Sequence, residues 1–310
     1  MTVTMKRIPL WILAALFCAL LWGSASPGIK LGYAFFHLDT NRVANIILYA
    51  GLRFAGAGLI TILLCPLFTK RRERYQTGIL PAAVKLGLVQ TVLQYLLFYL
   101  GLRVVSGAVG ALLTSMNIFF TILISTVLLR IEPPSPRKYL ACLLGLLGLL
   151  VLNLQTGFHF AFRLDGEGFV LLAALANAAA NLMIRAYGQR FNPMLLNGYQ
   201  FLFSGLLMSL IGLVFGADLG RPNLAAWGLM LYLMLLSVLA YGIWALLLAK
   251  YPPSDVVIFH SAVPIFGSLF SWLMLGEAVF NLRFLLALAL VAGGILLANL
   301  RRQRLRSERG

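Results

Sequence analysis

The stretch SAVPIFGSLFSWLMLGE, residues 261–277, has a proline as its fourth residue and ends on a glycine and a glutamate. Pro264 lacks a backbone N–H and clashes with the carbonyl four residues earlier, so the carbonyl of His260 is predicted to be released or the helix to bend. Unsatisfied backbone in hydrocarbon is tolerated only against protein or a watery cavity. This helix is therefore predicted to line a path; the alternative is a kink satisfied by neighbouring helices.

The whole chain has the composition of a membrane protein. Of its 310 residues 61% are hydrophobic and 11% charged, and the mean hydropathy is +0.92, which lies outside the range of soluble domains. Apolar runs of about 20 residues, enough to cross about 30 Å of hydrocarbon, recur along almost the whole sequence. The first run begins near Leu10 and continues without an A-x-A cleavage site, so it is predicted to be a retained helix and not a signal peptide.

Apolar runs between charged or Pro/Gly-rich breaks predict an all-α integral membrane protein with ten transmembrane helices. The predicted ranges are 9–31, 43–68, 80–101, 107–129, 138–155, 167–187, 194–215, 223–249, 254–275 and 282–300. Most of the net charge of +16 then falls on one side of the membrane, together with the basic tail RRQRLRSERG. By the positive-inside rule this side is the cytoplasm and holds both termini. The charge indicates topology and contact with an anionic inner leaflet, and not nucleic-acid binding.

The pattern around Pro264 has a counterpart near the middle of the chain, TSMNIFFTILISTVLLRIE at 114–132. Counting back from Asn117 and Pro264 aligns residues 94–117 with 241–264. This predicts two five-helix repeats, 1–157 and 158–300, followed by a basic cytoplasmic tail, 301–310. Because five is odd, the second repeat enters the membrane in the opposite orientation. Such inverted repeats are associated with alternating access around a site near the midplane.

Three motifs carry a resemblance to a known family: LLWGS at 20–24, LRF at 52–54 and the stretch 261–277. With the paired helices, they resemble the EamA-type branch of the drug/metabolite transporter superfamily over nearly the whole chain. The most specific part is the P-x12-E spacing from Pro264 to Glu277; in the first repeat, Asn117 replaces the proline and Glu132 comes two positions late. The resemblance implies a ten-helix carrier of small molecules in a bacterial plasma membrane. Members of the family export amino acids and other small metabolites.

Arg53 is the strongest single candidate for substrate binding. It lies near the middle of the second predicted span, where an ionisable residue is costly and marks a functional site by default. Its guanidinium offers five donors in a fork that matches a carboxylate or a phosphate. If it faces a cavity, the substrate is an anion or a zwitterion. The alternative is a structural role, on helix-end carbonyls or at the membrane interface.

Acidic residues fall only in loops or at the ends of the predicted helices. They are Asp39, Glu73, Glu132, Asp165, Glu167, Asp218, Asp255, Glu277 and Glu308. Proton-coupled efflux of cationic drugs usually needs a buried acid, so a cation antiporter is disfavoured. Glu277 is interpreted as a structural residue at a helix end, with proton transfer as the alternative. His260 is interpreted as a packing residue, with proton coupling as the alternative.

Uncharged polar and aromatic residues complete the predicted substrate site. They are Trp22, Tyr49, Gln94, Tyr95, Tyr99, Asn117, Asn177, Asn181, Tyr199, Gln200, Tyr241, Trp244 and Ser261. Gln90 and Gln94 are four residues apart, as are Tyr95 and Tyr99, so each pair shares a helix face. Such side chains form small-molecule cavities or hydrogen-bond between helices, and about half of them are expected to be packing.

Motifs of catalysis, ATP binding and metal binding are absent from the sequence, so no enzyme, cofactor or metal is predicted. Cys18, Cys65 and Cys142 are interpreted as buried hydrophobic residues. The predicted function is a secondary transporter, an exporter of a small metabolite such as an amino acid or another carboxylate-bearing solute. It would act by alternating access, as a monomer or dimer. A flippase for a lipid-linked carrier and a cationic drug efflux protein remain the alternatives on the same fold.

Overall fold

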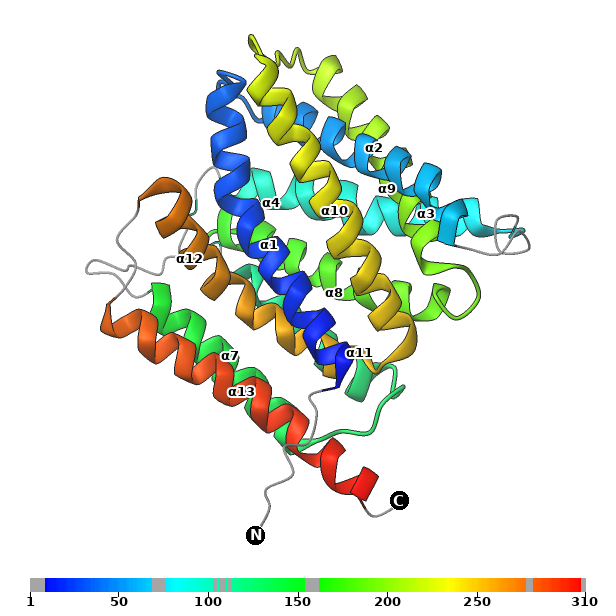
Figure 1. Cartoon of the computed structure of the whole chain (residues 1–310), viewed down its shortest axis with the longest axis vertical. Helices are drawn as coiled ribbons and strands as arrows, with labels where there is room; N and C mark the ends of the chain where they lie inside the picture. Colours follow the sequence, from blue (N-terminus) through cyan, green and yellow to red (C-terminus); the bar gives the residue numbers. More distant parts are fainter. Residues whose placement is uncertain are drawn as a thin grey trace.

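Helices form the fold. The computed structural model describes residues 9–68, 76–102, 105, 110, 113–153, 162–276 and 281–307, and these ranges contain no strand (Figure 1). Among them, seven helices are long and apolar enough to cross a membrane: Leu10–Phe35, Val43–Cys65, Ile79–Gly101, Leu164–Tyr187, Pro193–Val214, Leu224–Lys250 and Pro253–Met274. Met116–Leu128 and Leu282–Ala298 are shorter apolar helices. This architecture is that of a multi-pass membrane protein.

The first half of the chain departs from the predicted α-helices in two π-helical segments. Its elements are α1 (Leu10–Phe35), α2 (Val43–Phe68), α3 (Ile79–Gly87), η2 (Leu88–Leu93), α4 (Gln94–Leu102), α6 (Met116–Leu123), η3 (Ile124–Leu128) and α7 (Pro136–Asn153). The predicted helix 80–101 contains a π-helical segment, η2, a deviation that is frequent at functional sites. The predicted helix 107–129 lies partly outside the described residues.

The second half contains a break at the proline pattern. Its elements are η4 (Leu164–Gly168), α8 (Phe169–Tyr187), α9 (Pro193–Val214), α10 (Leu224–Lys250), α11 (Pro253–Val257), η5 (Ile258–Ala262), α12 (Val263–Leu275) and α13 (Leu282–Ser307). The predicted helix 254–275 is thus three pieces. The apolar part of α13 ends at Ala298, close to the expected end at residue 300, and the helix continues to Ser307 through part of the basic tail.

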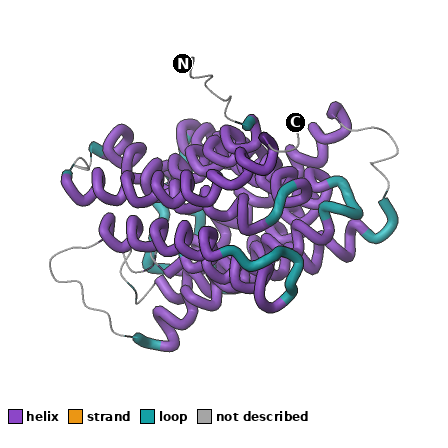
Figure 2. The backbone as a smooth tube through the Cα atoms, turned by 90° about the horizontal axis from the view of Figure 1, so that it is seen from below, coloured by secondary structure: helices purple, strands orange, loops and turns teal. Residues whose placement is uncertain are grey.

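Side-chain caps set two of the helix starts in the second half. Asn192 accepts hydrogen bonds from the backbone N–H groups of Met194 and Leu195, at 3.0 and 3.1 Å, and Pro193 occupies the first helical position of α9. Asn223 caps α10 in the same way. These contacts satisfy amide groups that have no partner inside the helix. Loops join the helix ends, as Figure 2 shows.

Two pairs of helices pack closely, α2 with α9 and α7 with α13 (Figure 1). Glycines permit the α2–α9 contact: a Cβ at Gly51 would lie 2.6 Å from the backbone N of Ser209 and 2.9 Å from the carbonyl oxygen of Gly205. A Cβ at Gly205 would in turn collide with the backbone of Ala55. The two backbones therefore meet without intervening side chains, as small residues allow in membranes.

Replacing Gly51 by leucine is expected to destabilise the protein strongly. The added side chain would need space now occupied by the backbone of α9, and overpacking of a tight contact costs about 1–3 kcal/mol or more. The matched control is Gly228→Leu on α10, since nothing lies within 4 Å of a Cβ at Gly228. Thermal unfolding in detergent should show a lower Tm for Gly51→Leu alone, and equal values for both variants would contradict this account of the packing.

Candidate functional site

A cavity of about 520 Å³ lies among helices from both halves of the chain, within the size range of small-molecule sites. Twelve predicted residues line it: Trp22, Arg53, Gln94, Tyr95, Tyr99, Asn117, Asn177, Asn181, Tyr241, Trp244, His260 and Pro264. Gln90, Thr114 and Ser115 line it as well. The cavity thus brings together residues that are far apart in sequence, from Trp22 on α1 to Gly267 on α12.

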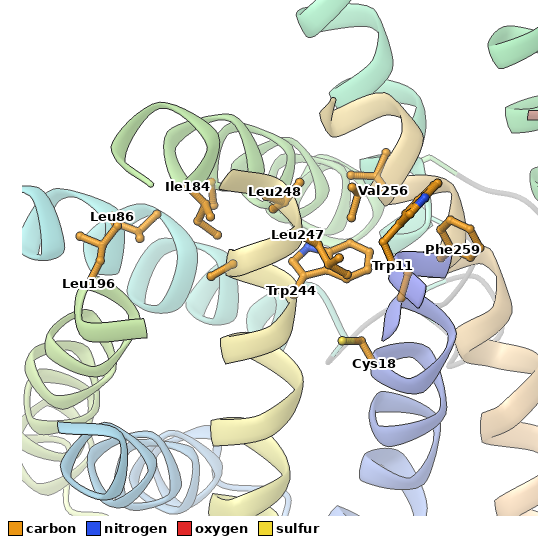
Figure 3. Close-up of a cluster of buried hydrophobic side chains, with 14 of the residues drawn as sticks. Trp11, Cys18, Leu86, Ile184, Leu196, Trp244, Leu247, Leu248, Val256 and Phe259 are labelled. Atoms are coloured by element: carbon orange, nitrogen blue, oxygen red, sulfur yellow. The ribbon is translucent and has the colours of Figure 1, made fainter. Parts of the chain in front are cut away.

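The cavity lies towards the end of the bundle where α1 finishes. Its α1 lining runs from Trp22 to Tyr33, close to the helix end at Phe35. Towards the start of α1 the bundle is instead filled by a hydrophobic cluster (Figure 3). There the ring of Trp11 lies 5.1 Å from that of Tyr251 and 5.7 Å from that of Phe259. These side chains pack the bundle at that end.

Arg53 lies on α2 with only 6% of its surface exposed, and it lines the cavity. Its Nε has no hydrogen-bond partner, and no ion pair to it occurs among the described residues. Arg185 shows what a structural arginine does in this fold, because its Nη1 donates to the carbonyls of Leu248 and Ala249 at the end of α10. Arg53 makes no such contact in the described part of the chain.

Tyrosines surround the guanidinium of Arg53. The phenol groups of Tyr33, Tyr95, Tyr99 and Tyr241 all lie within range to interact with its charge. Tyr95 and Tyr241 share a hydrogen bond of 3.0 Å between their hydroxyls, which joins α4 to α10. Neutral phenols cannot neutralise a buried cation. The ring of Phe54 lies 4.4 Å from Arg53 Cζ, and no anionic group among the described residues pairs with the guanidinium.

A chain of side-chain amides also lines the cavity. Asn117 Nδ2 donates to Asn177 Oδ1 at 3.1 Å, and Asn177 Nδ2 donates to Gln94 Oε1 at 3.0 Å. Asn181 Nδ2 also donates to Asn177 Oδ1, at 3.3 Å, while Asn181 Oδ1 accepts from Trp244 Nε1 at 3.3 Å. These bonds join α4, α6, α8 and α10 at the cavity.

His260 and Pro264 stand at the break in the helix. The imidazole stacks on Trp244 with ring centroids 4.3 Å apart and meets the edge of Trp22 at 4.7 Å. Of the two outcomes predicted at Pro264, release of the His260 carbonyl does not occur: this carbonyl accepts the backbone N–H of Val263 in the 3-10 segment η5. Pro264 sits in the first turn of α12, where a missing N–H is tolerated. The break is therefore satisfied locally, and both residues still line the cavity.

Four predicted site residues lie elsewhere. Tyr49 packs against Tyr33 and Phe36; Tyr199 packs on the hydrophobic cluster of Figure 3. Gln200 is fully buried and accepts from the hydroxyl of Thr91 at 3.0 Å, which links α9 to η2.

The fourth is Ser261, whose hydroxyl donates to the carbonyl of Ile258 at 2.6 Å. Its side chain also faces α7, since a Cβ at Gly145 would lie 3.2 Å from it. These contacts make Ser261 a packing residue.

None of the acidic residues that the structure describes lines the cavity. Glu132 is buried in the loop before α7, where it binds Lys138 and Ser254. Glu277 and Glu308 lie outside the described residues, as does Glu73. The described part of the cavity wall therefore offers a cation, Arg53, and no carboxylate.

Sequence reasoning missed Tyr33, Ile29 and Ala25 on α1 and Ser237 on α10. The signal was helical periodicity: residues 22, 25, 29 and 33 recur every three or four positions, and so lie on one face of α1. Once Trp22 is assigned to the cavity, its neighbours on that face follow.

The sequence pattern of the EamA-like transporter family matches residues 9–154 and again residues 164–300. The chain belongs to the EamA-like transporter family.

Relatives of this EamA-like transporter agree with that assignment. The uncharacterized transporter YetK of Bacillus subtilis is 26% identical over 272 residues, covering 84% of this chain and 80% of YetK. The uncharacterized transporter sll0355 of Synechocystis is 30% identical over 141 residues, 45% of this chain and 42% of that protein. A solved crystal structure covers 94% of this chain and 97% of its own, with a TM-score of 0.75 and 19% identity, which supports the fold alone. The molecule is therefore a membrane transporter.

Proposed function

We propose that this EamA-like transporter is a secondary carrier that exports a small carboxylate-bearing metabolite, such as an amino acid, across the plasma membrane. The observation that carries the proposal is Arg53, a buried cation in the cavity wall without an anionic partner among the described residues. An uncompensated buried charge is costly. A carboxylate in the cavity would supply the compensation, with the fork of the guanidinium setting its orientation.

The same wall argues against efflux of cationic drugs. Arg53 would repel a cation, and no described carboxylate lines the cavity to exchange a proton for one. The proposed partners are the solute and a bilayer with an anionic inner leaflet. With most Lys and Arg on one side, both termini are placed in the cytoplasm.

The proposed architecture is ten spans in two inverted repeats, residues 1–157 and 158–300. The repeated family match supports it, and so does the pairing of α2 with α9, the second helices of the two halves. Gly212 lies against Leu48 and Gly198 against Thr61, so these two helices run antiparallel. Helices in equivalent positions of inverted repeats must run in opposite directions.

The remaining contacts follow the same rule. α7 and α13, the fifth helices, are antiparallel, because Gly148 lies against Val291 and Gly294 against Ala141. α1 packs on α10 and α12, while α8 packs on α4 and α6. In the second half, α8, α10 and α12 are the counterparts of α1, α4 and α6 in the first half. Exchanging the two halves therefore converts the contacts of α1 into those of α8. Such symmetry gives two related arrangements of the bundle, one open to each side, which is what alternating access requires.

Export by wild-type protein tests the proposal. Bacteria that express the transporter are expected to enrich one or more carboxylate-bearing metabolites in the medium, relative to cells with an empty vector. The measurement is mass spectrometry of the medium and of the cell contents. Enrichment limited to cationic compounds would contradict the proposed substrate class, and depletion from the medium would contradict the direction.

A further inference from the structure

The hydrogen bonds of the amide chain in the cavity wall run in one direction. Two side chains that contact Asn181, those of Trp244 and Thr121, determine this direction. The indole Nε1 of Trp244 can only donate, so Asn181 must turn its Oδ1 towards it. Thr121 gives its hydroxyl proton to the carbonyl of Asn117 at 2.7 Å, so it can only accept from Asn181 Nδ2, which lies 3.5 Å away. Both neighbours require the same orientation of Asn181.

The orientation of the Asn181 amide determines the orientation of the next amides in the chain. Because Asn181 presents Nδ2 to Asn177, Asn177 must present Oδ1, and its own Nδ2 donates to Gln94. Asn117 meets the same Oδ1 through its Nδ2. Turning the Asn117 amide over would place two carbonyl oxygens against each other. The Oδ1 of Asn117 is therefore left as the free end of the chain.

That free end is an unpaired acceptor at the cavity. Asn117 is 6% exposed and lines the cavity, and its Oδ1 has no hydrogen-bond partner. Gln90 lines the same cavity from η2, is 5% exposed, and has an unpaired Oε1 as well. Buried carbonyl oxygens of this kind are stabilised only by a donor. A carboxylate cannot serve, because it brings acceptors alone.

We propose that Asn117 Oδ1, supported by Gln90 Oε1, forms an acceptor subsite that requires a hydrogen-bond donor on the solute, an ammonium or a hydroxyl group. This inference rests on the proposed function, in which Arg53 binds the anionic group of the same solute. Trp244, Asn181 and Asn177 are positioning residues, since they hold the amide of Asn117 in one orientation. Sites built to hydrogen-bond a substrate group discriminate strongly against the analogue that lacks it.

The test compares acids that share one carbon skeleton. Purified wild-type protein in detergent is titrated calorimetrically with 4-methylpentanoate, 2-hydroxy-4-methylpentanoate and leucine, and in parallel with 3-phenylpropionate, 3-phenyllactate and phenylalanine. At least one donor-bearing acid is expected to bind ten- to hundredfold more tightly than its unsubstituted parent. The hydroxy and amino members distinguish a hydroxyl from an ammonium group. Equal affinities within each series would overturn the inference and leave the proposed function standing, whereas no binding by any acid would count against both.

Substitutions in the cavity wall identify the residues that cause the preference for donor-bearing acids. Asn117→Leu is expected to reduce at least fivefold the ratio of affinities between a donor-bearing acid and its unsubstituted parent. Asn117→Asp should favour the amino acid over the hydroxy acid, since the acceptor gains a negative charge. Gln90→Met should reduce the discrimination less than Asn117→Leu. The Tm of each ligand-free variant checks folding. Discrimination that survives both Asn117→Leu and Gln90→Met would overturn the assignment.

Discussion

Replacing Arg53 by methionine is expected to slow export about ten- to hundredfold while leaving the ligand-free protein at least as stable as the wild type. The guanidinium is buried, lacks a hydrogen bond at Nε and has no ion pair among the described residues, so its removal deletes no internal contact of that kind. Replacing buried charge by an apolar side chain of similar volume is often neutral or stabilising. Each lost hydrogen bond to a charged group costs about 1.5–3 kcal/mol, which slows export about ten- to hundredfold.

Measuring both the export rate and the stability of Arg53→Met distinguishes a binding role of Arg53 from a structural one. A structural arginine such as Arg185, which binds two carbonyls at the end of α10, should lower the Tm when it is replaced. Arg185→Met is therefore the matched control. Export is measured as the appearance of the solute outside vesicles, and stability as thermal unfolding in detergent. A Tm of Arg53→Met that falls as far as that of Arg185→Met would assign Arg53 a structural role.

Breaking a polar cluster between α7 and α11 is expected to loosen the bundle there. Glu132, in the loop before α7, accepts from Lys138 Nζ at 3.0 Å and from the backbone N–H and hydroxyl of Ser254 on α11. Lys138 Nζ also lies 2.7 Å from Asp255. The cluster joins the first half of the chain to the second, and it stands next to the side chains that fill the bundle below the cavity. Alternating access would require it to open.

Lys138→Met removes the cation between two carboxylates. Removing one partner of a buried pair costs about 3–5 kcal/mol, and less is expected here because the side chain of Lys138 is 17% exposed. The expected result is a roughly tenfold or greater increase in the labelling rate of a cysteine introduced at Val256, which is fully buried behind the cluster. Arg163→Met is the matched control, since its pair with Asp165 is 59% and 60% exposed and such pairs contribute little. Equal labelling rates would contradict a closing role.

The sequence predicts the seven long apolar helices of the described residues, because long apolar runs have few alternatives in a membrane. It predicts a disturbance of the helix at Pro264 but not its form, a local change to 3-10 geometry at η5, and it does not predict the π-helical segment η2. Both deviations depend on which neighbours supply space and hydrogen bonds. The position of Arg53 in the middle of an apolar run was enough to select it.

Orientation around the helix axis limits the prediction of the site. Tyr199 and Gln200 lie on α9, whose packing against α2, α3 and η2 turns these side chains away from the cavity. Tyr33 was missed although it shares a face of α1 with Trp22. Polar residues of a membrane helix either face a cavity or bridge helices, and tertiary packing decides between the two.

The central claim, that the cavity binds an anionic group at Arg53, is tested most directly by ligand-induced thermal stabilisation. Wild-type protein and Arg53→Met are screened against amino acids, organic acids, sugar phosphates, nucleotide sugars and cationic drugs. A ligand at about 100 times its Kd stabilises the folded state by about 2.7 kcal/mol. The account predicts a higher Tm of the wild type with carboxylates or phosphates and no shift in Arg53→Met. Equal shifts in both proteins, or shifts with cations alone, would contradict it.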